Sequence, residues 1–65
     1  MKNNVLFYSI EPVTFSNIDA EISEYTKNNG YYPDYIDMPS FVYDKYRLMY
    51  PSKIYRGIHV RERCL

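Results

Sequence analysis

The chain contains one cysteine and one histidine in 65 residues, so the usual covalent and metal supports of a very small domain are absent. Cys64 has no second cysteine to pair with, and together with His59 it lacks the paired spacing of a structural zinc site. A single core of this size supplies only about 3–5 kcal/mol of net stability. We therefore expect one small domain, residues 1–65, without metal or cofactor, stabilised by aromatic packing or by association with a second chain.

The composition indicates a folded protein. Hydrophobic residues make up 46% and aromatic residues 18% of the chain, more than disordered chains contain. No apolar run approaches the ~20 residues that span a bilayer. The short apolar run near the start is soon interrupted by Glu11 and Pro12, so we expect neither a signal peptide nor membrane contact. With a lone thiol as well, the prediction is a cytoplasmic protein.

The chain has no net charge, yet its two parts are oppositely charged. Residues 1–44 contain two lysines against seven carboxylates, a net charge of −5, and residues 45–65 contain six basic side chains against Glu62, a net charge of +5. Such asymmetry is able to steer a charged partner toward the protein. We favour the alternative, in which the two parts neutralise each other within the fold or across a dimer.

The first 30 residues predict a strand followed by a helix. Val5–Ile10 is rich in β-branched and aromatic residues and ends at Glu11-Pro12, which is typical of a strand. Ser16–Asp19 matches a capping box and predicts the start of a helix. Apolar residues then recur with helical spacing: Phe15, Ile18, Ile22 and Tyr25. Gly30 predicts where this helix ends.

A second strand and a second helix follow. Tyr35–Met38 alternates inward apolar residues with an outward, solvated Asp37, and it is the weakest of the predicted strands. Pro39 suits the first turn of a helix because no N–H is needed there, and Ser40 is an alternative cap. The buried face of this helix follows helical spacing: Val42, Tyr46 and Met49. Pro51 ends the helix.

The last predicted strand is Lys53–Arg61. Its alternation is interrupted at Arg56, where Gly57 indicates a bulge. The predicted order is therefore β-α-β-α-β. Short strands that alternate with helices favour a small α+β fold, in which a single sheet is covered by two helices on one face.

Part of the chain follows a pattern found in another group of proteins. The stretch Ile36-Asp37-Met38-Pro39, then Tyr43, then Tyr55-Arg56-Gly57-Ile58-His59-Val60 resembles a segment of tailed-phage capsid proteins and related phage products, over roughly residues 34–61. The resemblance implies a phage or mobile-element origin and a β-α-β unit. Capsid subunits are several times longer, so a shell-forming role does not follow. The position of Pro39 also departs from the commoner Ser-Pro order.

Sequence signatures of enzymes are missing. The two glycines are too few for a phosphate-binding loop, and no G-x-S-x-G, H-E-x-x-H or C-x-x-C motif occurs. His59 is predicted to be a solvent-facing strand residue, and Cys64 is too close to the chain end for a positioned nucleophile. Asp34 and Asp37 offer too few oxygens for calcium. We expect a protein without catalytic residues and without a metal site.

Tyrosine is the residue type that most indicates a function. Seven of the nine tyrosines fall between Tyr31 and Tyr55, and tyrosine and arginine are enriched where protein interfaces are strongest. Tyr46 shares the predicted core face, whereas a second stripe of the same helix, with tyrosines that precede the helix nearby, is the predicted contact surface. The predicted protein-binding residues are Tyr43, Arg47, Tyr50, Tyr31 and Tyr32. The alternative is that Tyr43 and Tyr50 pack against the core.

Nucleic-acid binding is the alternative function. Basic residues interleaved with tyrosines provide phosphate contacts and stacking surfaces. The residues for this alternative are Lys53, Tyr55, Arg56, Arg61 and Arg63. The lack of net charge argues against it. We therefore expect a small protein-binding accessory protein, encoded by a phage or mobile element, that inhibits or redirects a host factor or associates with itself.

Overall fold

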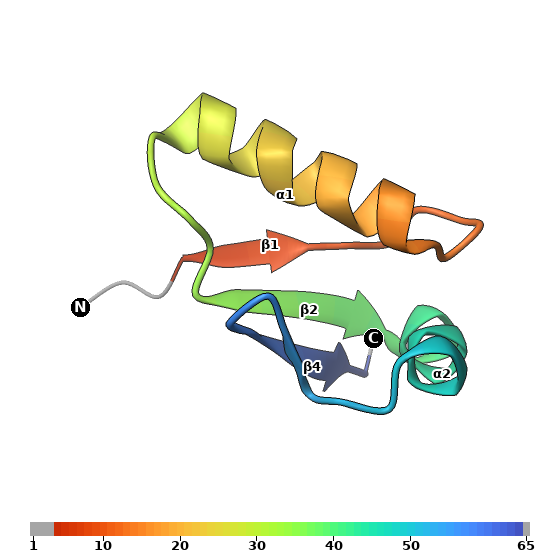
Figure 1. Cartoon of the computed structure of the whole chain (residues 1–65). Helices are drawn as coiled ribbons and strands as arrows, with labels where there is room; N and C mark the ends of the chain where they lie inside the picture. The colour runs from red at the N-terminus through yellow and green to blue at the C-terminus, as the bar shows by residue number, and fades with distance from the viewer. Residues whose placement is uncertain (1–3, 65) are drawn as a thin grey trace.

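The computed structural model describes residues 4–64 and confirms the α+β fold (Figure 1). The elements are β1 (Val5–Phe7), α1 (Phe15–Asn29), β2 (Tyr35–Pro39), α2 (Ser40–Met49), β3 (Ile54–Tyr55) and β4 (Ile58–Arg63). The strands form one sheet in the order β1-β2-β4-β3, in which β1, β2 and β4 are parallel and β3 is antiparallel to β4. Within this part of the chain, no helix is long and apolar enough to cross a membrane.

Both helices lie on one face of the sheet, and the path of the chain explains why. The step from β1 to β2 and the step from β2 to β4 advance across the sheet in the same direction. Crossovers between parallel strands are right-handed, so two steps in one direction place both connecting helices on the same face. Figure 1 shows α1 running along the sheet and α2 at one end of it, where α2 packs against β2 and β4.

The core lies between the helices and the inward-facing residues of the strands. Its buried members are Leu6, Tyr8, Ile18, Ile22, Ile36, Met38, Val42, Tyr46, Tyr55, Ile58 and Val60. They include the residues that helical spacing predicted for α1 and α2, apart from Tyr25 and Met49, which are only partly buried, and Phe15, which is exposed. The accessible surface is 4404 Å², close to the ~4400 Å² expected of a monomeric protein of this mass. The accessible surface is therefore ordinary for a single-chain protein of this mass.

The start of α1 differs from the prediction. Thr14 is the N-cap, and its Oγ1 accepts a hydrogen bond of 3.1 Å from the backbone N–H of Asn17. The capping box predicted at Ser16 is therefore wrong, and Asp19 makes contacts elsewhere in the fold. The end of α1 is confirmed, because Gly30 adopts the left-handed conformation with φ 80°.

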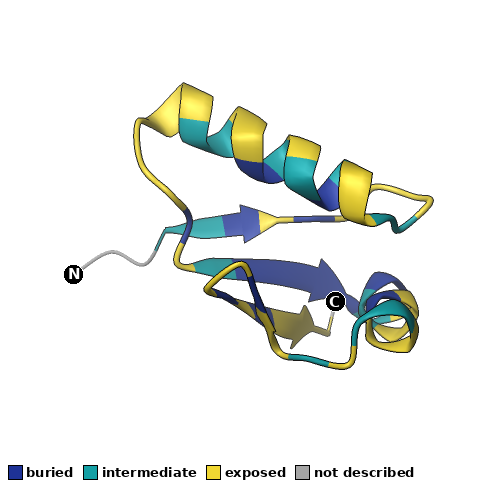
Figure 2. Ribbon diagram, in the orientation of Figure 1, coloured by how far each residue is buried: buried dark blue, intermediate teal, exposed yellow. Residues whose placement is uncertain are grey.

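The strand predicted to be weakest, β2, is one of the two central strands of the sheet. It pairs with β1 on one side and with β4 on the other, and Figure 2 shows it buried along most of its length. Asp37, predicted to be solvated, is only 6% exposed. Arg61 donates two hydrogen bonds to its carboxylate, at 2.7 and 3.1 Å, and Arg63 lies 3.6 Å away. Side chains of β4, rather than a helix, thus cover this face of β2.

The predicted last strand is a hairpin instead. β3 and β4 are joined by Arg56 and Gly57, whose φ angles are 51° and 81°. Tight two-residue hairpin turns with φ above zero at both positions match the twist of the flanking strands. The bulge predicted at Gly57 is therefore wrong. The prediction failed because arginine is an unusual residue at the first position of such a turn.

Two other boundaries differ by a few residues. β1 ends at Phe7 rather than at Ile10. Pro39 is the N-cap of α2 and the last residue of β2, rather than part of the first helical turn. The helix ends two residues before Pro51, so its predicted stop is confirmed.

The opposite charges of the two parts of the chain neutralise each other within the fold. Every ion pair among residues 4–64 joins a carboxylate from the first 44 residues to a basic side chain beyond them. The pairs are Glu11–Lys45, Asp19–Arg56, Asp37–Arg61 and Asp37–Arg63. The favoured interpretation of the charge pattern is confirmed, because these ion pairs neutralise much of the charge difference between the two parts of the chain within the fold.

Two buried tyrosines differ in whether the hydroxyl has a partner. The Tyr46 hydroxyl donates a hydrogen bond of 2.8 Å to the carbonyl of Ser52. The Tyr8 side chain is equally buried, but its hydroxyl has no hydrogen-bond partner among the described residues. A buried polar group without a partner costs about 1–3 kcal/mol, and a typical hydrogen bond contributes about 1 kcal/mol.

We expect Tyr8→Phe to raise the free energy of unfolding by about 1 kcal/mol and Tyr46→Phe to lower it by about 1 kcal/mol. Urea denaturation followed by circular dichroism measures both. Each variant keeps the ring and loses one oxygen, so each is the control for the other. A loss of stability in Tyr8→Phe would show that its hydroxyl has a partner after all.

Candidate functional site

A groove lies between α1 and the β3–β4 hairpin, on the face of the sheet that carries the helices. It consists of two neighbouring depressions of about 440 and 270 Å³, which share Asp19 and Arg56. The larger is lined by Asp19, Ile22, Ser23, Thr26, Lys27, Tyr32 and Arg56. The smaller is lined by Phe15, Asp19, Tyr50, Tyr55 and Arg56. We call the two together the α1–hairpin groove.

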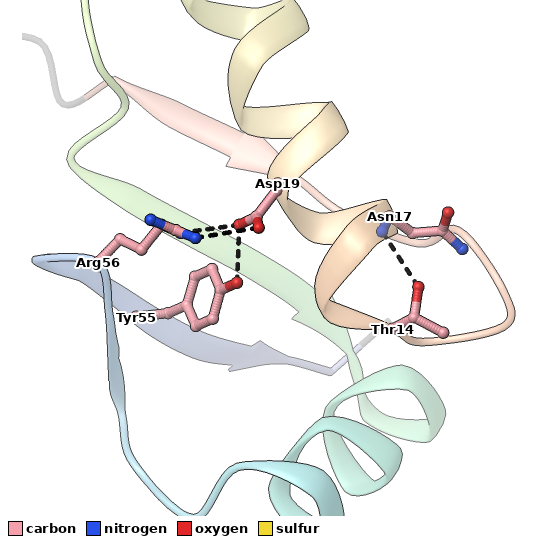
Figure 3. Close-up of polar contacts among 5 residues, drawn as sticks. All are labelled: Thr14, Asn17, Asp19, Tyr55 and Arg56. Atoms are coloured by element: carbon pink, nitrogen blue, oxygen red, sulfur yellow. Dashed lines mark hydrogen bonds and ion pairs between the residues drawn. The ribbon is translucent and has the colours of Figure 1, made fainter.

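An ion pair with an additional donor lies at the centre of the groove. Figure 3 shows Tyr55 and Arg56 reaching from the hairpin toward Asp19 on α1. Arg56 donates from Nε and Nη2 to the two carboxylate oxygens, at 2.8 and 3.1 Å. The hydroxyl of Tyr55 donates to Oδ1 of Asp19 at 2.7 Å. These three hydrogen bonds fasten the hairpin to α1.

The same contacts shift the pKa values of all three groups. The hydrogen bonds from Tyr55 and Arg56 lower the pKa of Asp19. Burial, and then the hydrogen bond to Asp19, raises the pKa of Tyr55. The hydrogen bond to Asp19 also raises the pKa of Arg56. At neutral pH the carboxylate therefore stays ionised and both donors keep their protons.

Three aromatic rings form one end of the groove. Phe15 stacks on Tyr55 with ring centroids 5.9 Å apart and an interplanar angle of 12°. Tyr50 meets Phe15 and Tyr55 edge to face, at 5.8 and 5.6 Å. The sequence predicted Phe15 on the buried face of α1, but its position in the first turn leaves it 42% exposed. The groove therefore offers an aromatic surface that solvent reaches.

The structure separates the five residues predicted to bind a protein. Tyr32 and Tyr50 line different depressions of the groove, whereas Tyr31 lines neither. Tyr43 and Arg47 lie outside the groove on α2, where Arg47 Nη1 donates a hydrogen bond of 3.1 Å to the Tyr43 hydroxyl. Tyr43 and Tyr50 are both partly buried against the core. In Figure 1 the loop after α1 lies far from α2, so the five residues do not form one surface.

The residues of the nucleic-acid alternative are also dispersed. Tyr55 is only 6% exposed, and it lies with Arg56 on the face that carries the helices. Arg61 and Arg63 point to the opposite face of the sheet, as their pairing with β2 requires. Lys53 precedes β3 in the loop from α2. Among these residues no exposed ring lies beside the arginines for bases to stack on.

Sequence reasoning missed most of the α1 residues that line the groove. None of the three polar residues Asp19, Ser23 and Lys27 was predicted to line a site, and Asp19 was predicted to complete the capping box at Ser16. Together with Phe15 they recur every four residues, so they form a stripe next to the buried Ile18 stripe. A mixed stripe of this kind, aromatic at one end and charged at the other, is the sequence feature that corresponds to the α1 side of the groove.

Within residues 4–64 no cluster of three or more histidine, cysteine or acidic side chains is placed to hold a metal ion. His59 lies on the sheet face opposite the groove, because it pairs with Tyr35 in the same row. Comparisons with protein-family models, with curated proteins and with solved structures find no match to this chain.

Proposed function

We propose that the chain is a small, non-enzymatic protein-binding protein that holds a short segment of its partner in the α1–hairpin groove. The observation that carries this proposal is the aromatic end of the groove, where the exposed Phe15 and the half-buried Tyr50 pack on the buried Tyr55, beside the ion pair of Asp19 and Arg56. Such rings dominate protein interfaces because they bury a large area with few rotamers. A concave, largely apolar surface with a few convergent polar groups is the usual form of a binding site.

The length of the groove fits a linear peptide. Phe15 and Lys27 are twelve positions apart on α1, which corresponds to about 18 Å along the helix axis. An extended segment of about five or six residues covers that distance. Its apolar side chain contacts the three rings, and its polar groups lie near Arg56 and Lys27.

The partner follows from the origin that the resemblance implies. Residues 34–61 resemble a phage segment, and the short chain and its abundant tyrosines suit an accessory protein that occupies a site on a host protein. The lack of catalytic motifs in the sequence supports the same role. We place the chain in this group, with a host factor as the partner and a second copy of the chain as the other candidate.

Two matched pairs of variants test the proposal. Phe15→Ala and Tyr32→Ala each remove a half-exposed ring that lines the groove. Phe41→Ala and Tyr31→Ala remove rings of similar exposure outside it. With the tagged chain as bait in lysate of its source cell, we expect the two groove variants to lose most of the captured partner. The two controls are expected to capture as much as the wild type.

Equal capture by all four variants would show that the groove is not the binding surface. Loss of capture only in Phe41→Ala or Tyr31→Ala would move the binding surface to α2 or to the loop after α1. Light scattering of the purified chain, alone and with Phe15→Ala, distinguishes a second copy from a different protein. A dimer that Phe15→Ala dissociates identifies the partner as the chain itself.

A further inference from the structure

We infer that the partner segment carries a carboxylate, which binds beside Arg56 and Lys27, next to an apolar side chain that covers the three rings. This inference rests on the proposed function and deepens it, because it names the chemistry of the segment. Two independent observations carry it. One is the balance of donors and acceptors in the groove, and the other is the backbone conformation of Arg56.

The acceptor in the groove is already satisfied, whereas several donors are free. The carboxylate of Asp19 accepts three hydrogen bonds from Tyr55 and Arg56. Arg56 has five N–H groups and uses two of them on Asp19. Three of its donors therefore remain for a ligand, and its side chain is more than half exposed.

The larger depression adds further donors. The hydroxyl of Thr26 is used, because it donates to the carbonyl of Ile22 at 2.8 Å. In the described part of the chain, the side chains of Ser23, Lys27 and Tyr32 form no hydrogen bond. Two cations, Lys27 and Arg56, thus share the groove with one carboxylate, which already accepts three hydrogen bonds. A ligand carboxylate would accept from these donors, whereas a basic ligand would meet two like charges.

The backbone of Arg56 points to the same conclusion. Arg56 has φ 51°, a left-handed conformation that glycine and asparagine adopt at lower cost than arginine. Either residue would make a more stable turn here. Strained positions of this kind are found where a side chain is required for function. The turn places the guanidinium group of Arg56 at the centre of the groove, where Asp19 holds it and its remaining planar donors suit a second carboxylate.

A peptide selection tests the inference. A randomised library of synthetic hexapeptides, half of it amidated at the C-terminus, is selected on the full-length chain and on the Arg56→Gly variant. We expect Asp or Glu to be enriched beside an apolar residue in the amidated half. Enrichment only in the non-amidated half would identify a C-terminal carboxylate as the source and would equally support the inference.

The variants separate binding from folding. Arg56→Gly removes the guanidinium and relieves the positive φ, so we expect a urea midpoint at least as high as that of the wild type and about tenfold or greater loss of affinity for the enriched peptide. We expect Lys27→Gln, on the exposed end of α1, to weaken binding to a smaller extent than Arg56→Gly. Because Lys27 lies outside the turn, this substitution leaves the turn conformation unchanged. Arg47→Gln removes an exposed arginine outside the groove and should bind like the wild type.

The opposite outcomes are equally clear. The inference would be overturned if neutral or basic peptides bind best, or if Arg56→Gly and Lys27→Gln bind the enriched peptide as tightly as the wild type does. The proposed function would remain in place, provided that Phe15→Ala still abolishes binding. No enriched peptide from either half would overturn both.

Discussion

Replacing Tyr46 with alanine is expected to leave the chain unfolded in water. The ring is fully buried, and the rings of Tyr43, Tyr50 and Tyr55 surround it at centroid distances of 6.3, 6.0 and 6.5 Å. Truncation of a buried aromatic side chain costs about 3–5 kcal/mol. A core of this size supplies only about 3–5 kcal/mol in total. Far-UV circular dichroism and the dispersion of the amide NMR spectrum measure the loss, with the half-exposed Tyr32→Ala as the folded control.

The ionisation of Tyr46 provides a second measure of the same burial. Burial raises the pKa of Tyr46 to about 12, from 10.0 for an exposed tyrosine. The folded state therefore favours the neutral hydroxyl, and this stabilisation is fully present below pH 10 and is lost as the pH rises through 12. A difference of two pKa units corresponds to about 2.7 kcal/mol. Cooperative alkaline unfolding of the wild type is therefore expected between pH 10 and pH 12.

For the Tyr46→Ala variant, a dispersed amide NMR spectrum would contradict the central role of the ring.

The second large effect is expected at Arg61. Arg61→Gln leaves the buried carboxylate of Asp37 with Arg63 as its remaining cation, at 3.6 Å. Leaving a buried carboxylate unpaired costs about 3–5 kcal/mol, and Arg63 recovers part of that. We therefore expect Arg61→Gln to lose a large fraction of the free energy of unfolding, which is measured as a marked fall in the urea midpoint.

Arg56→Gln is the matched control for Arg61→Gln. Both arginines donate from Nε and Nη2 to one carboxylate with nearly equal distances. The carboxylates differ in burial, since the side chain of Asp19 is 38% exposed and that of Asp37 only 8%. Water replaces the lost partner of Asp19, so the midpoint of Arg56→Gln should change little. Equal effects in the two variants would show that burial of the carboxylate does not decide the outcome.

The helices were predictable from the sequence because their signals are local. The spacing of Ile18 and Ile22 identifies the buried face of α1, and Gly30 marks its end, all within one short window. The N-cap was predicted at the wrong residue because Thr14 and Ser16 are both able to cap, and the helical pattern alone does not rank them. The choice depends on where the preceding loop places the first turn.

The groove and the buried carboxylate were not predictable because they depend on distant partners. Asp19 and Arg56 are 37 positions apart, and Asp37 and Arg61 are 24 positions apart. Alternation along a strand tells which face a side chain occupies, but it does not tell what covers that face. The hairpin was missed for a related reason, since Arg56 keeps a costly turn conformation that propensity argues against.

The parallel pairing of the sheet also affects how fast this small chain folds. Val5 pairs with Tyr35 and Tyr35 pairs with His59, so each parallel ladder joins residues more than twenty positions apart. Only the β3–β4 hairpin pairs neighbours in the chain. The loop-closure entropy of both ladders has to be overcome before either contributes to stability. The chain therefore has a higher contact order than a helical bundle of the same size, and we expect it to fold more slowly in spite of its short length.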